Sequence, residues 1–301
     1  MTLRLGTRGS ALALAQSGHV ADAITAATGE PVELVEIVTE GDRSSAPVPQ
    51  LGVGVFVSAL RDALAAKEID LAVHSYKDLP TAPVDGLTIA AVPPREDPRD
   101  AFLGRTGSTL DALPAGARIG TGALRRIAQL RALDRRYECV SLRGNVDTRL
   151  RKLAAGEVDA VVLAAAGLRR LGRASEITEL LEPEVMLPAP AQGALAVECR
   201  TADRSLVDQL RCVDDEHTRT AVAAERSLLA TLEAGCSAPV AALARIIDGN
   251  IELWAAVFAP DGTSAVRRHG TGPPSDAVGL GSRLAAQMLA NGADLLLGET
   301  A

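Results

Sequence analysis

Residues 117–164 read ARIGTGALRRIAQLRALDRRYECVSLRGNVDTRLRKLAAGEVDAVVLA, in which short apolar runs alternate with helical patterns. The alternation predicts strands at 117–121, 138–142 and 158–164 and helices at 123–133 and 146–155. Strands that alternate with helices of about ten residues are typical of mainly parallel sheets covered by helices on both faces. This stretch therefore predicts an α/β domain.

The N-terminal part of the chain repeats this organisation. Strands are predicted at 3–6, 32–39, 69–74 and 87–92, and helices at 10–28 and 53–67. The polar segment REDPR at 95–99 is expected to be a first crossing between the two blocks. LPAPAQG at 187–193 marks a second crossing, after which residues 194–198 are expected to return to the first domain. Two blocks joined in this way predict two α/β domains with mixed, mainly parallel sheets and a cleft between them.

The C-terminal part changes character. A helix at 218–232 precedes three predicted antiparallel strands, at 240–247, 251–258 and 264–270, with Asp-Gly turns at Asp248 and Asp261, and a last helix covers 276–290. This pattern predicts a small α+β domain. The expected domains are therefore 1–93 with 194–212, then 99–188, and finally 216–301.

Composition excludes several classes of protein. The chain has 301 residues, of which 47% are hydrophobic and 23% are charged, a balance typical of globular domains and not of disordered chains. The apolar run at 160–168 is too short to cross a bilayer, and the N-terminus has no signal-peptide pattern. The four cysteines show no CxxC spacing and lie far from the histidines in sequence, so no zinc site is expected, and without an export signal the thiols are expected to be reduced.

Positive charge is concentrated in one region. The net charge is −7, yet residues 118–173 hold 12 arginines and one lysine against five acidic residues, a local net charge of +8. A coding bias toward arginine explains the preference over lysine but does not explain the clustering. A basic region inside an acidic chain favours a small anionic ligand over general polyanion affinity.

Three predicted strand–helix junctions place arginines beside a glycine turn. These junctions are residues 6–10 with Arg8, 121–126 with Arg125 and Arg126, and 142–149 with Arg143 and Arg149. Helix N-termini offer free N–H groups, and guanidinium groups bind carboxylates or phosphates with forked hydrogen bonds. One such junction is often only a turn, but three with arginine predict an anion site. Arg169 and Arg170 follow a fourth strand and fit either this site or a solvated helix end.

Two further segments carry reactive side chains. LAVHSYKDLP at 71–80 places Asp78 after an apolar strand, where it could cap a helix, pair with Lys77, or steady a cation and move a proton. EAGCSAP at 233–239 places Cys236 on a loop after a helix, where it fits a nucleophile or attachment point as well as a buried position.

Taken together, these segments closely resemble the hydroxymethylbilane synthase, or porphobilinogen deaminase, family. The resemblance runs from about residue 4 to residue 292 and keeps the order of the motifs. The matching motifs are GTRGSALAL at 6–14, AVHSYKDLPT at 72–81, REDPRDAF at 95–102, SLRGNVDTRL at 141–150, AAGLRRLG at 165–172, LPAPAQGALAVECR at 187–200 and LEAGCSAPV at 232–240.

The resemblance implies two lobes like those of periplasmic binding proteins, a small third domain, and a transferase activity in tetrapyrrole biosynthesis. Four porphobilinogen molecules would be joined head to tail on a dipyrromethane cofactor, with loss of ammonia at each addition and hydrolytic release of hydroxymethylbilane. It also implies a monomer in the cytoplasm, with no metal, nucleic acid or membrane partner.

By the motif match, Asp78 stabilises the cationic pyrrole formed when ammonia leaves, and Cys236 carries the cofactor through a thioether. Clustered arginines suit the acetate and propionate of each pyrrole ring. The residues that the match assigns to cofactor and substrate binding are Arg8, Ser10, Lys77, Thr121, Arg125, Arg126, Arg143, Arg149, Arg170 and Gln192.

The chain departs from the family pattern in two places. Val53 and Ser58 lie where relatives often have lysines, and Gly122 and Ala123 replace hydroxyl residues in the turn before Arg125. Neither change touches Asp78 or Cys236, so activity is expected to survive. The main alternative is a two-lobed protein that binds a small anion without chemistry, which would need the arginines but not the cysteine.

Overall fold

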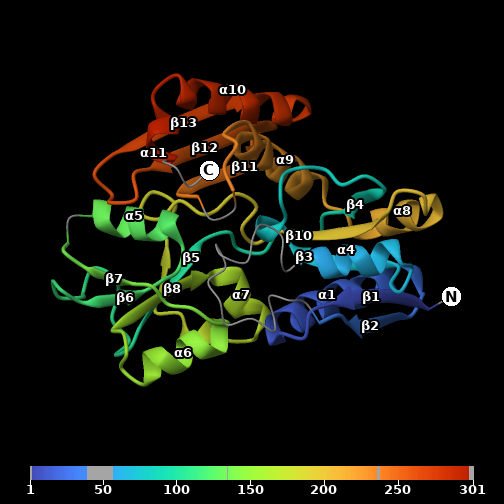
Figure 1. Ribbon diagram of the computed structural model, residues 1–301, viewed down its shortest axis with the longest axis horizontal. Coiled ribbons are helices and arrows are strands. Elements are labelled where there is room, and N and C mark those ends of the chain that lie inside the picture. Colours follow the sequence, from blue (N-terminus) through green and yellow to red (C-terminus); the bar gives the residue numbers. More distant parts are fainter. Residues whose placement is uncertain (1, 39–56, 134, 236–237, 298–301) are drawn as a thin grey trace. The chain divides into compact units, whose positions relative to one another are not determined.

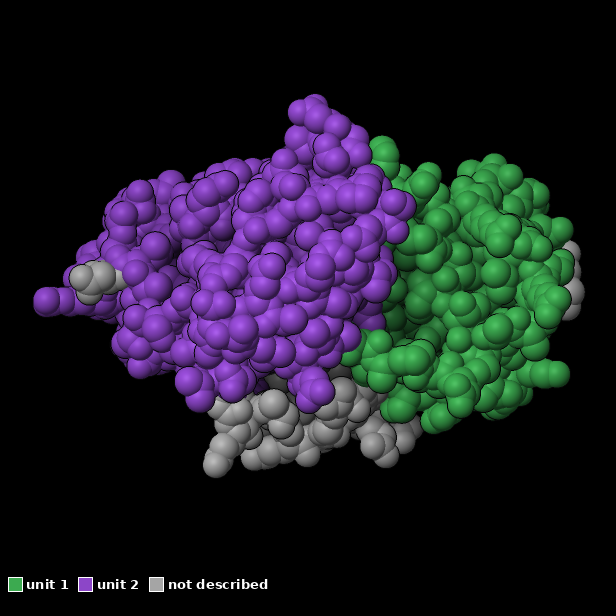
Figure 2. Space-filling view, turned by 90° about the horizontal axis from the view of Figure 1, so that it is seen from above, with its two compact units in different colours: residues 1–95, 194–219 green, residues 96–193, 220–301 purple. Residues whose placement is uncertain are grey.

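The computed structural model describes residues 2–38, 57–133, 135–235 and 238–297. The chain divides into two compact units, coloured separately in Figure 2. Unit 1 comprises residues 1–95 and 194–219, and unit 2 comprises residues 96–193 and 220–301. Two of the positions discussed above, Val53 and Cys236, lie outside the described residues.

Unit 1 is built on a five-stranded sheet in the order β2-β1-β3-β10-β4 (Figure 1). The strands are β1 (Leu3–Thr7), β2 (Val32–Glu36), β3 (Leu71–Ser75), β4 (Leu87–Ala91) and β10 (Leu195–Arg200). Only β10 runs against the other strands, since it pairs antiparallel with both β3 and β4. The helices are α1 (Ala11–Thr28), α4 (Ser58–Ala65) and α8 (Arg204–Leu210). The chain thus returns to this sheet after the second crossing.

The first sheet of unit 2 repeats this topology, in the order β7-β6-β8-β5-β9. The strands are β5 (Asp100–Gly104), β6 (Arg118–Gly120), β7 (Glu138–Val140), β8 (Ala160–Ala164) and β9 (Glu179–Leu181). The helices are α5 (Leu124–Ala132), α6 (Val146–Ala154) and α7 (Ala165–Arg170). Again one strand, β5, runs against its neighbours β8 and β9. In both sheets the reversed strand is the first one after a crossing, and the predicted class of mixed, mainly parallel α/β sheets is confirmed.

The C-terminal part of unit 2 forms the predicted α+β arrangement. Strands β11 (Val240–Ile247), β12 (Asn250–Phe258) and β13 (Ala265–Gly272) pair antiparallel in sequence order. Asp248 and Gly249 both have positive φ, at 49° and 77°, as a tight two-residue hairpin turn requires. Helices α9 (Glu216–Thr231), α10 (Ala277–Leu289) and α11 (Ala293–Leu297) complete this part.

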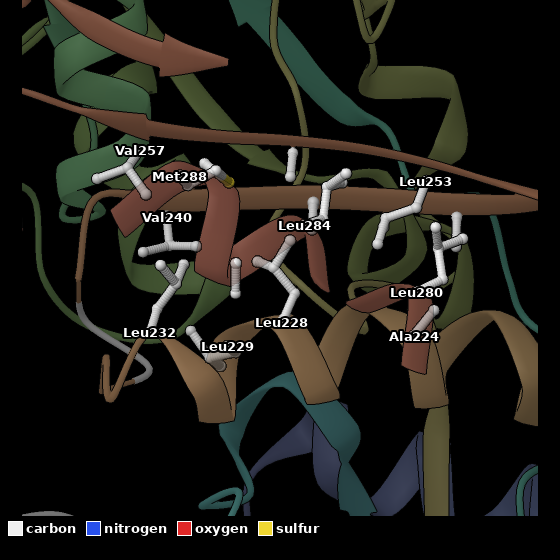
Figure 3. Packing of buried hydrophobic residues seen from close by; sticks show 14 of the residues in the cluster. Ala224, Leu228, Leu229, Leu232, Val240, Leu253, Val257, Leu280, Leu284 and Met288 are labelled. Carbon is white, nitrogen blue, oxygen red and sulfur yellow. The ribbon is translucent and has the colours of Figure 1, made fainter. Parts of the chain in front are cut away.

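The core of this C-terminal part is a layer of leucine, valine and alanine side chains between helices and sheet (Figure 3). Leu228 of α9 and Leu232, just after the end of that helix, pack with Leu253 of β12 and with Leu284 and Met288 of α10. All five side chains are at most 3% exposed, so this layer fixes helix α9 on the sheet.

The other face of the C-terminal sheet packs on helix α5. Ala128 of α5 and Leu187 of the second crossing form one buried cluster with Ala241, Leu243 and Phe258. This cluster explains why residues 220–301 group with residues 96–193 in one unit, whereas the sequence suggests a separate third domain. No helix in the described ranges combines the length and the apolar character needed to cross a bilayer.

Two strands, β5 and β9, are absent from the expected elements. β5 begins directly after the polar segment REDPR at 95–99, which reads as a crossing, and β9 is a run of only three residues after a 3₁₀ turn. β5 matters for function because it begins with the fully buried Asp100.

Candidate active site

Asp78 lies at the carboxyl end of the buried strand β3, in the short 3₁₀ turn Tyr76–Asp78. Leu71, Ala72 and Val73 anchor the strand, being at most 7% exposed. The side chain of Asp78 is exposed and makes no hydrogen bond or ion pair within the described part of the chain. Lys77 beside it is half-buried. Asp78 therefore presents a carboxylate that is neither a helix cap nor the partner of a neighbouring cation.

A buried polar network holds the end of β3. Gln16 of α1 and Ser75 exchange hydrogen bonds of 2.9 and 3.2 Å. His74 lies 3.1 Å from Glu198 of β10, whose carboxylate also accepts two bonds from the Arg61 Nε. Burial opposes ionisation of Glu198, but the hydrogen bonds from His74 and Arg61 outweigh it and hold the pKa of Glu198 below its ordinary value. His74 and Ser75, just before Asp78, are thus held by side chains of β10 and α1.

Arg8 and Ser10 lie in the turn between β1 and α1. Ser10 is the N-cap of α1, and its hydroxyl oxygen accepts a hydrogen bond of 3.3 Å from the Ala13 N–H. The hydroxyl proton stays available as a donor, in keeping with the binding role that the motif match predicts. The Arg8 side chain is half-buried.

In unit 2, Arg125 and Arg126 are 4% and 5% exposed and share one fully buried carboxylate, that of Asp100. Arg125 donates to Asp100 at 2.6 and 3.1 Å, and Arg126 donates to it at 2.7 and 3.1 Å. Burial opposes ionisation of Asp100, yet the two guanidinium groups hold its pKa far below the usual range. Most donors of these arginines are thus used inside the protein, although two cations against one anion leave a surplus positive charge.

Gln192 and Thr121 are also fully buried. Gln192 donates to Asp100 at 2.9 Å and to the Pro98 carbonyl at 2.8 Å, and accepts from Arg125 at 3.0 Å. The Thr121 hydroxyl accepts from the Ala123 N–H at 3.4 Å, which closes the turn before α5. Both side chains therefore organise the arginine cluster, and direct contact with a ligand remains only a prediction for them.

Three other predicted arginines form no ion pair with a carboxylate among the described residues: Arg143, Arg149 and Arg170. The negative charge of Glu96 acts on Arg170 but does not outweigh the effect of burial on its pKa. Arg149 donates to the Gly144 carbonyl at 2.9 Å, and Arg170 donates to the Gly193 carbonyl at 2.7 Å. Burial lowers the pKa of both guanidinium groups. By contrast, Arg169 is exposed in the last turn of α7 and pairs with Asp97 at 3.0 Å, which fits the alternative of a solvated helix end. Partly buried cations without an anion are suited to bind carboxylates.

The segment around Cys236 lies outside the described residues, but both flanks are anchored. Leu232 and Ala234 are 3% and 6% exposed after the end of α9, and the Ala238 N–H donates to the Gly235 carbonyl at 3.0 Å. The predicted attachment role of Cys236 stays a prediction.

Sequence reasoning missed Asp100, which organises the arginine cluster. The only signal is an acidic residue at the start of an apolar run, directly after PR in the REDPRDAF motif. Its importance depends on two side chains 25 and 26 residues away, a separation that no local pattern reveals.

Replacing Asp100 by asparagine is expected to lower the free energy of unfolding by about 3 kcal/mol, because two buried guanidinium groups would lose their counter-charge. Urea unfolding measures this effect. Asp111→Asn, which removes one partner of an exposed pair with Arg135 in the same unit, should change stability by less than about 0.5 kcal/mol. Equal effects of the two substitutions would contradict the assigned role of Asp100.

The same carboxylate predicts a pH dependence. Because the folded pKa of Asp100 lies below its unfolded value of about 3.9, its stabilising contribution is complete above that pH and is lost as the pH falls further. Between pH 4 and pH 2, the wild-type protein should therefore lose stability more steeply than Asp100→Asn. If the free energy of unfolding fell equally steeply with pH in the two proteins, Asp100 would not be the source of the acid sensitivity.

Comparison with known proteins identifies the family of this chain. Residues 3–208 match the family model described as porphobilinogen deaminase, dipyromethane cofactor binding domain, and residues 219–290 match the model of the porphobilinogen deaminase C-terminal domain. Porphobilinogen deaminase of Nocardia farcinica is 58% identical over 99% of this chain and 89% of its own length. Porphobilinogen deaminase 1 of Streptomyces coelicolor is 56% identical over 99% of this chain and 98% of its own length, and the Mycobacterium bovis porphobilinogen deaminase is 54% identical over 98% of each chain.

Among solved structures, a periplasmic substrate-binding protein from Coxiella burnetii aligns with 70% of this chain and 91% of its own length, at 13% identity and a TM-score of 0.45. On the evidence of its sequence matches, the chain belongs to the porphobilinogen deaminase family.

Proposed function

We propose that this protein is a hydroxymethylbilane synthase that adds four porphobilinogen molecules in turn to a covalently bound dipyrromethane and releases the linear tetrapyrrole by hydrolysis. The observation that carries the proposal is the combination of an unpaired carboxylate, Asp78, with partly buried arginines that lack an acidic partner among the described residues. Family membership over nearly the whole chain supports the same activity.

The residues present fit the cofactor. Each pyrrole ring of a dipyrromethane carries an acetate and a propionate, so the group is a polyanion that needs fixed cations. Arg149 and Arg170 supply two such cations, and the exposed Arg143 supplies a third. When bound, the dipyrromethane supplies the nucleophilic pyrrole carbon to which substrate is added. We assign its attachment to Cys236, as the motif match predicts.

Asp78 has the chemistry needed for the step in which porphobilinogen loses ammonia. The bond between the side-chain methylene and nitrogen breaks, and the positive charge that remains spreads onto the pyrrole N–H. A fixed carboxylate stabilises that charge and accepts a proton as the next bond forms. The fixed end of β3 favours such a role, because a preorganised charge needs no rearrangement during the reaction. Lys77, Arg8 and Ser10 are assigned to substrate carboxylates.

We further propose a division of labour along the chain. Residues 1–93 with 194–212 would carry the catalytic Asp78, residues 99–188 the carboxylate-binding arginines, and residues 216–301 the cofactor-bearing cysteine. The protein would act in the cytoplasm as a monomer.

The function is tested on the purified full-length chain. Incubation with porphobilinogen should release ammonia and produce a linear tetrapyrrole, and the intact mass should exceed the sequence mass by a dipyrromethane located on Cys236. An unmodified chain from a host that makes porphobilinogen would favour the alternative of a non-catalytic anion-binding protein. A modified chain that releases no ammonia would indicate a family member that has lost turnover.

Replacing Arg149 by alanine tests carboxylate binding. The KM for porphobilinogen is expected to rise about tenfold, because one charge-assisted hydrogen-bonding group is lost. Arg151→Ala removes an exposed cation from the same helix and should leave KM within about twofold of wild type. Similar shifts for both variants would show a general effect of charge and remove Arg149 from the binding site.

A further inference from the structure

Glu225 of helix α9 is fully buried in unit 2 and has no role in the function proposed above. Its carboxylate accepts hydrogen bonds from two backbone N–H groups on separate segments. Oε2 lies 2.5 Å from the Ala191 nitrogen, and Oε1 lies 2.7 Å from the Ala244 nitrogen of β11. We call residues 187–193 the strap. The Glu225 side chain therefore joins helix α9 to both the C-terminal sheet and the strap.

The strap contacts the arginine cluster through its backbone and one side chain. The Leu187 carbonyl accepts from Arg125 at 3.1 Å, and the Gly193 carbonyl accepts from Arg170 at 2.7 Å. Gln192 bridges Arg125 and Asp100. The orientation of two guanidinium groups thus depends on where the strap places these acceptors.

Ala191 is the residue of the strap whose backbone conformation is least favourable. Its φ of +60° is in the left-handed region, which is unfavourable for a residue with a Cβ atom, and the residue is fully buried. Its buried N–H requires an acceptor, and Glu225 provides one. Without that acceptor, the backbone at 191 would lose the contact that holds it in this conformation, and Gln192 and Gly193 would shift with it.

We propose that Glu225 is a positioning residue, whose carboxylate fixes the strap so that Arg170 keeps the orientation in which it binds a carboxylate, while Arg125 stays in its buried network with Asp100. The inference rests on the proposed function. Because Arg170 is assigned to a carboxylate remote from the reacting bond, its misplacement would weaken binding of the ground state and of the transition state alike, so KM should change while kcat does not.

The test is Glu225→Gln, assayed as holoenzyme. An amide oxygen accepts from one of the two N–H groups, whereas the amide nitrogen is a donor and faces the other without bonding it. The KM for porphobilinogen is expected to rise about fivefold, the equivalent of one hydrogen bond, with kcat within about twofold of wild type and the cofactor mass intact. Glu216→Gln, an exposed position on the same helix, should leave both constants unchanged.

An unchanged KM in folded Glu225→Gln, or a fall in kcat with no change in KM, would overturn the proposal. If Glu225→Gln does not fold, Glu225→Asp replaces it in the test. This variant keeps the negative charge but has a side chain one methylene shorter, and the same rise in KM is expected. If neither variant accumulates as folded holoenzyme, Glu225 supports the fold alone and the inference fails. Absence of deaminase activity in the wild type would instead refute the proposed function.

Discussion

Asp78→Ala should retain the fold and the bound cofactor but lose about a thousandfold in kcat. The side chain is exposed and unpaired within the described residues, so its removal leaves no buried group without a partner. Removal of a preorganised charge that acts on the transition state typically lowers kcat by about 10²–10³. The measurements are the initial rate of ammonia release, the thermal midpoint and the intact mass.

Two further variants test whether the loss of turnover comes from the charge of Asp78. Asp78→Asn keeps the shape and removes the charge, and its kcat should fall nearly as far as that of the alanine variant. Asp85→Ala, an exposed acid in the same unit, should remain within about twofold of wild type. Turnover near the wild-type rate in Asp78→Asn would show that the charge of Asp78 has no part in the mechanism.

Cys236→Ser should abolish covalent cofactor attachment and, with it, turnover. Attachment requires the sulfur to form a bond to the electrophilic methylene carbon left after ammonia departs, with loss of the thiol proton. A thiol reaches its nucleophilic thiolate form near neutral pH, whereas a serine hydroxyl does not without a dedicated base. Intact-mass spectrometry of the purified variant should therefore give the bare chain mass.

The other cysteines provide the control. Cys212 is exposed and Cys199 is buried, where burial raises the pKa of its thiol to about 11. Cys212→Ser is expected to carry the full dipyrromethane mass. A normal adduct on Cys236→Ser, or its loss in Cys212→Ser, would move the attachment point away from Cys236.

Local sequence patterns were sufficient for the fold class. The alternation of apolar runs and helices over 117–164 matches β6, α5, β7, α6 and β8, and the Asp-Gly turn at Asp248 joins β11 to β12 as predicted. The return of the chain after the second crossing agrees with the pairing of β10 between β3 and β4. The motifs also identified the family, which the comparisons confirmed.

The sequence did not distinguish between two kinds of arginine. Arg125, Arg126, Arg149 and Arg170 read alike as basic residues at helix ends, yet the first two share the buried Asp100 whereas the last two lack a carboxylate among the described residues. This difference depends on which acidic side chain the sheet brings close, and Asp100 is 25 and 26 residues away from the two arginines in the sequence.

What the sequence alone determined is therefore the fold class and the family, because these follow from local periodicity and short motifs, whereas the roles of Asp78 and Cys236 stay predictions. Only the tertiary structure decided which charges are neutralised internally and which remain for a ligand. The reason is physical: a buried charge is stable only beside a counter-charge or hydrogen-bond donors, and contacts such as Asp100 with Arg125 or Glu225 with the Ala191 N–H join residues 25 and 34 positions apart.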